Sequence, residues 1–395
     1  MTPPPAPPRL DTDTLIDDRR TRIIVCCGSG GVGKTTAAAA IGVRAAERGR
    51  HVVVLTVDPA RRLAQSMGLT HLDNVPRPVA GIDPAAGGSL HAMMLDMKRT
   101  FDEIVEAHAD PDRAAQILAN PFYQSLSSSF AGTQEYMAME KLGQLHRTNE
   151  WDLIVVDTPP SRSALDFLDA PQRLGRFLDG RLIRLLTAPA RTGRSYMKLL
   201  NAGFSIVTGT LTKVLGAQVL KDMQTFVTAF DTMFGGFRER AESTYRLLQT
   251  PGTAFIVVAA PEPDALREAS YFVERLAGER MPLAGLILNR VHRPVATQLS
   301  AARSIAAAET LETHEGSNEH VVAADAQRYA LAAGALRLHA ERMQLAARER
   351  RVAAHFTAAH PTVPVAEVAA QPEDVHDLEG LRLIGESLAR EPEPS

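Results

Sequence analysis

Almost uninterrupted apolar runs recur along the chain. They cover residues 23–27, 51–57, 153–157, 254–259 and 283–288. A run without polar alternation is typical of a strand that is buried on both faces of a parallel sheet. Between the runs, apolar residues recur at steps of three and four, which predicts helices. The pattern therefore predicts an α/β fold with a doubly wound, mostly parallel sheet.

Changes in composition outside these runs predict the domain organisation. Residues 1–20 are rich in Pro and Asp, and we expect them to form a flexible leader; residues 391–395 form a tail. Residues 21–390 are expected to form a single domain. Within it, residues 97–148 and 164–249 lose the strand pattern, and we expect them to form a helical insertion subdomain.

The C-terminal part of the domain is predicted to be mainly helical. Residues 300–322 are polar and Ala-rich, and we expect them to be mobile. A long Ala- and Arg-rich helix is predicted up to about Ala358, followed by a short strand near Val363. The last helix, at 378–388, is amphipathic, but its acidic flanks oppose binding to anionic lipid. We expect it to pack on the sheet.

A glycine-rich loop follows the first apolar run and opens a helix that begins at Thr36. The loop, Gly28–Thr35, has the pattern of a phosphate-binding loop in the required context of strand, loop and helix. Glycines let backbone N–H groups turn inward around an anion, and the helix N-terminus adds partial positive charge. We expect a nucleoside triphosphate to be bound by Gly30, Gly31, Val32, Gly33, Lys34, Thr35 and Thr36. The alternative is a glycine-rich turn that binds nothing.

Three polar residues of these motifs have predicted chemical roles. Lys34 is expected to reach the β- and γ-phosphates as a catalytic residue, while Thr35 offers its hydroxyl to Mg²⁺. Asp157 ends the run at 153–157, at the edge of the sheet where ligands bind in doubly wound folds. We predict that Asp157 holds Mg²⁺, directly or through water. The alternative is an ordinary turn aspartate.

Two further polar residues end apolar runs. Asp58 follows the run at 51–57 and is our candidate for the catalytic residue that orients the attacking water and accepts its proton. Asn289 closes the run at 283–288, where a side-chain amide can pair with the donor and acceptor of an adenine edge. The alternative for Asp58 is another turn residue.

Composition narrows the classes of function. The 43 basic residues nearly balance the 46 acidic ones, which argues against nucleic acid as a partner. The cysteines, Cys26 and Cys27, are adjacent on a predicted strand and exclude a disulfide framework or a zinc ribbon. The N-terminus lacks a secretion signal, and no window approaches the length of a membrane span. We expect a cytoplasmic protein that reaches the inner face of the membrane only through a partner.

In combination, these motifs resemble those of the ArsA and GET-pathway ATPases. This family includes the ATPase of the arsenite pump and the factor that targets tail-anchored membrane proteins. Residues 29–35 resemble the phosphate loop, Asp58-Pro59-Ala60 the first switch and Asp157-Thr158-Pro159-Pro160-Ser161 the second switch. The likeness continues in residues 132–136, in Pro261-Glu262 and in residues 288–290, and it covers nearly the whole chain.

The resemblance implies a P-loop ATPase that works as a nucleotide-gated dimer with ATP and Mg²⁺. In that scheme Asp58 activates water, and Lys34 and Thr35 hold the phosphates and Mg²⁺. The second switch, which starts at Asp157, reports the γ-phosphate to the helical insertion, and Asn289 recognises adenine.

Ser29 departs from the family pattern. Members with this type of loop usually carry a lysine there, which reaches the nucleotide of the partner subunit, whereas serine is short and uncharged. One hypothesis is that Arg61 or Arg62 supplies the charge in the manner of an arginine finger. Another is that the chain forms, instead of a homodimer, a heterodimer with a related ATPase subunit that carries the lysine. The cysteines that bind arsenite or zinc in family members have no counterpart.

The helical insertion is rich in Met and Phe, which leaves two interpretations open. In the targeting factors this region forms a groove for the membrane helix of a client, and adaptable Met side chains suit such a surface. By resemblance, the partner is an apolar helical client or a membrane protein. Alternatively, the same stripe packs against the core of the domain. The side chains concerned are Met197, Met223, Met233, Phe204, Phe226, Phe230, Phe234 and Phe237.

Two rival functions use the same kind of loop. A ParA/MinD-like positioning ATPase generally keeps the lysine that Ser29 replaces, and its membrane-bound type ends in a basic amphipathic helix. A weakly hydrolysing subunit would instead bind ATP as the structural partner of an active paralogue. A comparison of nucleotide affinity with turnover separates such a subunit from an active ATPase.

Overall fold

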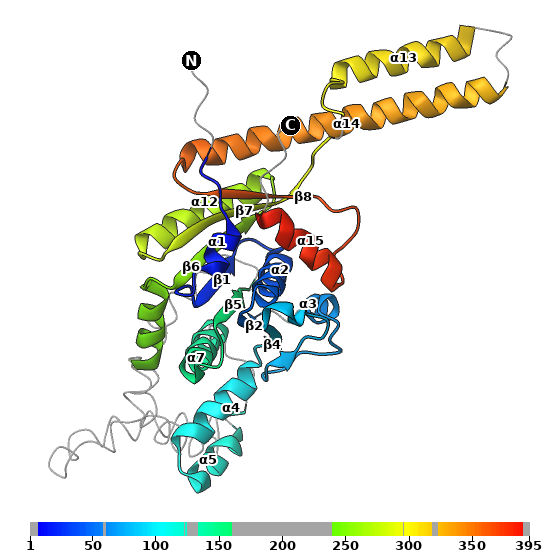
Figure 1. Ribbon diagram of the computed structural model, residues 1–395. Helices are drawn as coiled ribbons and strands as arrows, with labels where there is room; N and C mark the ends of the chain where they lie inside the picture. The colour runs from blue at the N-terminus through cyan, green and yellow to red at the C-terminus, as the bar shows by residue number, and fades with distance from the viewer. Residues whose placement is uncertain are drawn as a thin grey trace, which may run out of the picture.

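The computed structural model describes residues 7–57, 61–121, 123–124, 133–159, 239–294, 296–317 and 323–389. Within these residues, eight strands form one sheet in the order β3-β4-β2-β5-β1-β6-β7-β8, with helices packed around it (Figure 1). All neighbouring strands are parallel except β3 and β4. The predicted α/β fold with a mostly parallel sheet is confirmed.

Five of the strands, β1, β2, β5, β6 and β7, coincide with the apolar runs. The strands are β1 (Ile23–Cys27), β2 (His51–Thr56), β3 (Arg77–Pro78), β4 (Ser89–Met94), β5 (Leu153–Asp157), β6 (Thr253–Ala259), β7 (Leu283–Val291) and β8 (Val365–Ala369). β1 and β5 lie at the centre of the sheet and are buried along their whole length. Burial on both faces explains why these strands lack polar alternation.

The helices that the structure describes cover the chain between the strands. They are α1 (Thr12–Asp17), α2 (Lys34–Glu47), α3 (Arg61–Ser66), the 3₁₀ turn η1 (Pro84–Ala86), α4 (Met97–His108), α5 (Pro111–Leu118), α7 (Thr133–Thr148), α12 (Pro263–Gly278), α13 (Ala301–Ser317), α14 (Ala323–Ala359) and α15 (Leu378–Ala389). A further helix covers 239–249. Helices α4, α5 and α7 occupy the first segment expected to be helical, 97–148.

Helix α2 packs closely on the sheet because its inner face consists of small residues. The alanines from Ala37 to Ala40 are buried, and a Cβ atom on Gly42 would lie 2.6 Å from Cγ2 of Val54. Helix α15 contacts α2 and β8 and buries Leu381 and Ile384 there. The last helix is thus part of the domain's packing, and α2 is held rigidly with the loop that precedes it.

The N-terminal segment differs from the flexible leader predicted for residues 1–20. Helix α1 begins after Asp11, whose side chain caps it, and Ile16 is fully buried. Arg50 is also buried and donates to the carbonyl oxygens of Ile16 and Thr21 at 2.8 and 2.6 Å. The leader prediction is therefore wrong for α1, because tertiary contacts stabilise a helix too short to be recognised from its own composition.

The C-terminal helices α13 and α14 form a hairpin that extends away from the sheet (Figure 1). Small residues, Ser304, Ala308, Ala333 and Ala340, are buried along it. The predicted long helix is α14. The prediction of a mobile stretch at 300–322 is wrong for α13, since an Ala-rich polar sequence also suits a helix that packs on a neighbour through alanine.

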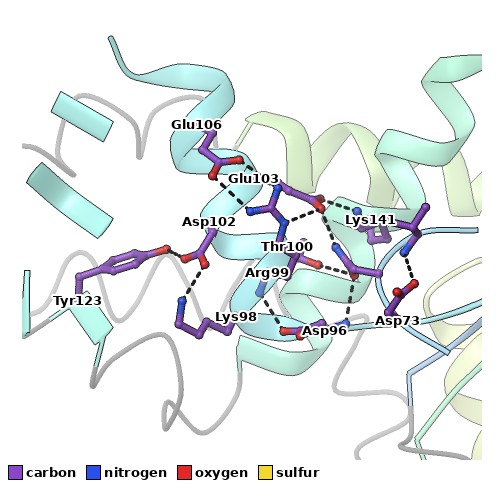
Figure 2. Close-up of polar contacts among 12 residues, drawn as sticks. Asp73, Asp96, Lys98, Arg99, Thr100, Asp102, Glu103, Glu106, Tyr123 and Lys141 are labelled. Carbon is purple, nitrogen blue, oxygen red and sulfur yellow. Dashed lines mark hydrogen bonds and ion pairs between the residues drawn. The ribbon is translucent and has the colours of Figure 1, made fainter. Parts of the chain in front are cut away.

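Charged side chains fix α4 to its surroundings (Figure 2). Glu103 of α4 accepts hydrogen bonds from Lys141 of α7 at 2.6 Å and from Asn74 at 3.1 Å. Lys141 is nearly inaccessible to solvent, so the ion pair is largely buried. The base of the helical material at 97–148 is thereby joined to the sheet domain through α7.

Part of the predicted insertion lies outside the described residues. This applies to residues 160–238, and with them to all the Met and Phe residues of the suggested client groove. Among the helices that are described, none combines the length and the apolar character needed to cross a bilayer.

Candidate nucleotide-binding site

The glycine-rich loop between β1 and α2 adopts a conformation that its glycines alone allow. Gly31 and Gly33 have φ angles of 75° and 94°, in the left-handed region that favours glycine. A Cβ atom on Gly33 would lie 2.2 Å from Nδ2 of Asn289, and one on Gly28 would lie 2.1 Å from the carbonyl oxygen of Val258. The loop therefore lies directly against the ends of β6 and β7.

Lys34 is the first residue of α2, and its side chain folds back across the loop. Its Nζ atom donates to the carbonyl oxygen of Ser29 at 2.8 Å, and the residue is buried. The ammonium group thus lies beside the glycines that the sequence assigns to phosphate binding. This is the arrangement that a phosphate-binding lysine requires.

The two predicted metal ligands are brought together at the centre of the sheet edge. The hydroxyl of Thr35, at the start of α2, donates to Oδ2 of Asp157 at the end of β5, over 2.7 Å. Asp157 is fully buried. A hydroxyl and a carboxylate are hard oxygen ligands of the kind that Mg²⁺ prefers.

Thr56 is a site residue that the sequence analysis missed. It is the last residue of β2, is fully buried, and donates its hydroxyl to the same Oδ2 atom of Asp157 at 3.0 Å. Its contact therefore helps to orient the carboxylate from the neighbouring strand. The available signal was a single hydroxyl near the end of an otherwise apolar run.

The residues present fit a nucleotide with a metal ion. Among the described residues no group of three or more His, Cys, Asp or Glu side chains could hold a metal by itself. Mg²⁺ commonly binds through one or two protein oxygens together with substrate phosphates and water. Thr35 and Asp157, beside a loop shaped for phosphate, match that mode.

Asn289 reaches the loop from β7. Its Nδ2 atom donates to the carbonyl oxygen of Val32 at 2.8 Å, although the two residues are 257 positions apart. An amide nitrogen has two hydrogens, so this contact uses one of them. The structure thus places Asn289 at the nucleotide loop.

Asp58 lies outside the described residues, together with Pro59 and Ala60. The residue before it, Val57, donates its N–H to the carbonyl oxygen of Asp157 at 3.0 Å. Val57, the last described residue before the predicted first switch, therefore lies beside the end of β5. Arg61 and Arg62 begin α3, and their side chains also lie outside the part that the structure describes.

An open cavity of about 750 Å³ lies on the outer side of the loop. Its lining includes Ser29, Gly30, Glu262, Glu268 and Arg290. Ser29 therefore borders open space. A ligand or a second subunit can approach it there.

The two cysteines are unsuited to act as nucleophiles. Both are free and buried in β1. Burial raises the pKa of the Cys27 thiol to about 12, and burial together with the charge of Asp157 raises the pKa of Cys26. Both thiols stay neutral at physiological pH, as expected of core residues.

Helix α2 starts with Lys-Thr directly after a glycine turn, and an aspartate from the adjacent strand faces it. This arrangement defines a class of protein. The class is the P-loop nucleoside triphosphatases. The family model described as "Anion-transporting ATPase" matches residues 21–312. The chain therefore belongs to the anion-transporting ATPase family and is an ATP hydrolase, which confirms the ArsA/GET resemblance and disfavours the positioning-ATPase alternative.

Curated relatives agree with this assignment. An "ATPase GET3" from Malassezia globosa is 24% identical over 288 residues, which cover 73% of this chain and 77% of the relative. An "ATPase GET3" from Chaetomium globosum is 23% identical over 283 residues, 71% of this chain and 76% of the relative. An "ATPase ASNA1 homolog" from Cryptosporidium parvum is 26% identical over 271 residues, 68% of this chain and 64% of the relative.

Proposed function

We propose that this ATPase is Mg²⁺-dependent and works as a nucleotide-gated dimer that couples ATP binding and hydrolysis to a client or a membrane partner. The observation that carries the metal dependence is the 2.7 Å contact between Thr35 and Asp157 beside the buried Lys34. Bound Mg²⁺ neutralises charge that develops on the phosphates during transfer.

The proposed roles of the chain's own residues are supported by their positions, except for the role of Asp58, which rests on the family resemblance. The loop residues from Gly30 to Thr36 surround the phosphates, and Lys34 places its charge on them. Thr35 and Asp157 hold the metal, and Asn289 pairs with the adenine edge through its amide. Asp58 orients the attacking water and accepts its proton.

Because Ser29 stands where the family usually has a lysine, two kinds of dimer are proposed. A homodimer needs another cation at the facing site, and Arg61 or Arg62 is the candidate. A heterodimer obtains the cation from a related subunit with the family's lysine, and this chain then binds ATP and hydrolyses it weakly by itself. The cavity next to Ser29 leaves room for a side chain of a second subunit in either case.

The client is proposed from the resemblance to the GET-pathway ATPases. We propose that residues 21–390 act as one ATPase domain whose helical insertion, at 97–148 and 164–249, receives an apolar helix or a membrane protein. The proposed location is cytoplasmic, with the inner face of the membrane reached through that partner, and reduced thiols at Cys26 and Cys27 are consistent with it.

The test is ATP turnover of the purified full-length chain with Mg²⁺ and with EDTA, combined with its mass in solution with and without ATP. We expect Mg²⁺-dependent turnover that Lys34→Ala abolishes, and a dimer that forms with ATP. Tight ATP binding with very slow turnover favours the heterodimer. Absence of both binding and turnover would overturn the proposal. Fast turnover by a homodimer of Arg61→Ala or Arg62→Ala excludes the finger role for that arginine.

A further inference from the structure

Strand β7 contains an extra residue at the point where it reaches the nucleotide loop. Its register with β8 changes between Leu288 and Val291, which is a bulge. Arg290, inside the bulge, has a φ of 63°, a left-handed conformation that disfavours any residue with a side chain. Bulges re-aim side chains next to active sites. Here the re-aimed residue is Asn289, whose amide contacts Val32.

Glu349 of α14 makes two contacts with His292, the residue that follows β7 and its bulge, and we call these two contacts the clamp. Glu349 accepts the backbone N–H of His292 on Oε2 at 2.8 Å, and Nδ1 of the His292 ring lies 2.6 Å from Oε1. A carboxylate only accepts hydrogen bonds, so Nδ1 carries its hydrogen here. Both oxygens of one carboxylate therefore fix both the backbone and the ring of His292.

The burial of Glu349 indicates that this contact is specific. The residue is 7% exposed, and a buried carboxylate is costly unless it is fully hydrogen-bonded. The neighbouring ion pair, Arg293 with Glu367, is 41% exposed at each side chain. That pair lies at the same strand ends but is much more exposed and makes no hydrogen bond to His292, so it provides a control.

We propose that Glu349 is a positioning residue for nucleotide recognition. By clamping His292 it holds Arg290 in its unfavourable conformation, and it thereby keeps Asn289 aimed at the site. Without the clamp the bulge relaxes, and the side chain of Asn289 loses its fixed direction. The inference rests on the proposed role of Asn289 in recognising adenine.

The expected consequence is selective for the base. Contacts to the phosphates come from α2 and its loop, which Glu349 does not touch. Loss of the clamp should therefore lower the preference for ATP over GTP about tenfold, a typical effect for a residue that orients another group. Affinity for inorganic tripolyphosphate should stay within about twofold.

The test measures the dissociation constants of the full-length chain for MgATP, MgGTP and tripolyphosphate. The variants are Glu349→Ala, Glu349→Gln, Asn289→Ala, the double variant Glu349→Ala with Asn289→Ala, and the control Glu367→Ala. We expect Asn289→Ala and Glu349→Ala each to reduce the ATP preference, and the double variant to lose no more than Asn289→Ala. Glu349→Gln should recover part of the preference, because its amide oxygen still accepts one hydrogen bond. Glu367→Ala should retain it.

The two possible failures are distinguishable. If Asn289→Ala removes the preference while Glu349→Ala and Glu349→Gln retain it, the positioning role is wrong and the proposed site stands. If the wild-type chain lacks a preference, or Asn289→Ala leaves it unchanged, the adenine role is wrong and the inference falls with it. If Glu349→Ala fails to fold, Glu349→Gln decides by the same ratio.

Discussion

The hydroxyl of Thr35 donates to the carboxylate of Asp157 over 2.7 Å, across the junction of α2 and β5. The start of α2, directly after the glycine-rich loop, and the end of β5 therefore meet at one carboxylate oxygen. A change in the ligands of this oxygen acts on both elements at once.

Thr56→Val should weaken metal use without loss of the fold. The substitution keeps the side-chain shape but removes the hydroxyl that donates to Asp157 at 3.0 Å. Removal of a group that orients a metal ligand commonly costs about tenfold or more in metal affinity. We expect the Mg²⁺ concentration for half-maximal ATPase to rise about tenfold. The control is Thr253→Val, a buried threonine on β6 that donates to the carbonyl oxygen of Leu247; an equal effect there would contradict the prediction.

Gly33→Ala should abolish nucleotide binding. An alanine there combines a φ of 94° with a Cβ atom 2.2 Å from Asn289, so the loop must distort. Gly68 has a similar φ of 67°, but a Cβ atom there would meet no described residue within 4 Å beyond its chain neighbours. Gly68→Ala should therefore cost about 1 kcal/mol of unfolding free energy and leave ATP affinity unchanged. Titration with a fluorescent ATP analogue measures the ATP affinity of both variants. An unchanged affinity of Gly33→Ala would refute the assignment of this loop to phosphate binding.

Two ion pairs, each between a lysine and a carboxylate of α4, should differ in their effect on stability (Figure 2). Lys141 lies 2.6 Å from Glu103 and has a side chain 7% exposed, while Lys98 lies 2.7 Å from Asp102 and is 50% exposed. Lys141→Ala removes a nearly buried lysine from Glu103, which keeps its contacts with Asn74 and Arg99, and should cost about 2 kcal/mol of unfolding free energy. Lys98→Ala should cost less than about 1 kcal/mol. Urea denaturation measures both, and equal losses would be inconsistent with the buried pair.

Because of Cys27, the free energy of unfolding should decrease as the pH rises in the alkaline range. Its folded pKa is about 12, raised by burial from an ordinary value of 9.0. The unfolded chain therefore releases this proton first, so the unfolding free energy falls as pH rises from about 9 toward 12. A thiol reagent at about pH 8.5, near the ordinary thiol pKa, should label Cys27 only after unfolding. Rapid labelling of the native protein would contradict the burial, and Cys27→Ala should remove this part of the pH dependence.

How far the sequence predicted the structure depended on the kind of signal. β1, β2 and β5 were predictable because strands buried on both faces form unbroken apolar runs, and the loop was predictable from its glycines. The role of Thr56 was not predictable, since one hydroxyl in an apolar run has no periodic signature. Likewise Glu349 is one charge among many on an Arg-rich helix, and its partner His292 lies 57 positions away.

The most direct test of the account is the Mg²⁺ dependence of ATP turnover for the wild-type chain and for Asp157→Asn. The control is Asp152→Asn, directly before β5. If Thr35 and Asp157 form the metal site, wild-type turnover stops in EDTA. Asp157→Asn then lowers turnover at saturating ATP at least about tenfold and raises the Mg²⁺ requirement, while Asp152→Asn behaves as wild type. Asp157→Asn with the wild-type rate and Mg²⁺ requirement would contradict the account.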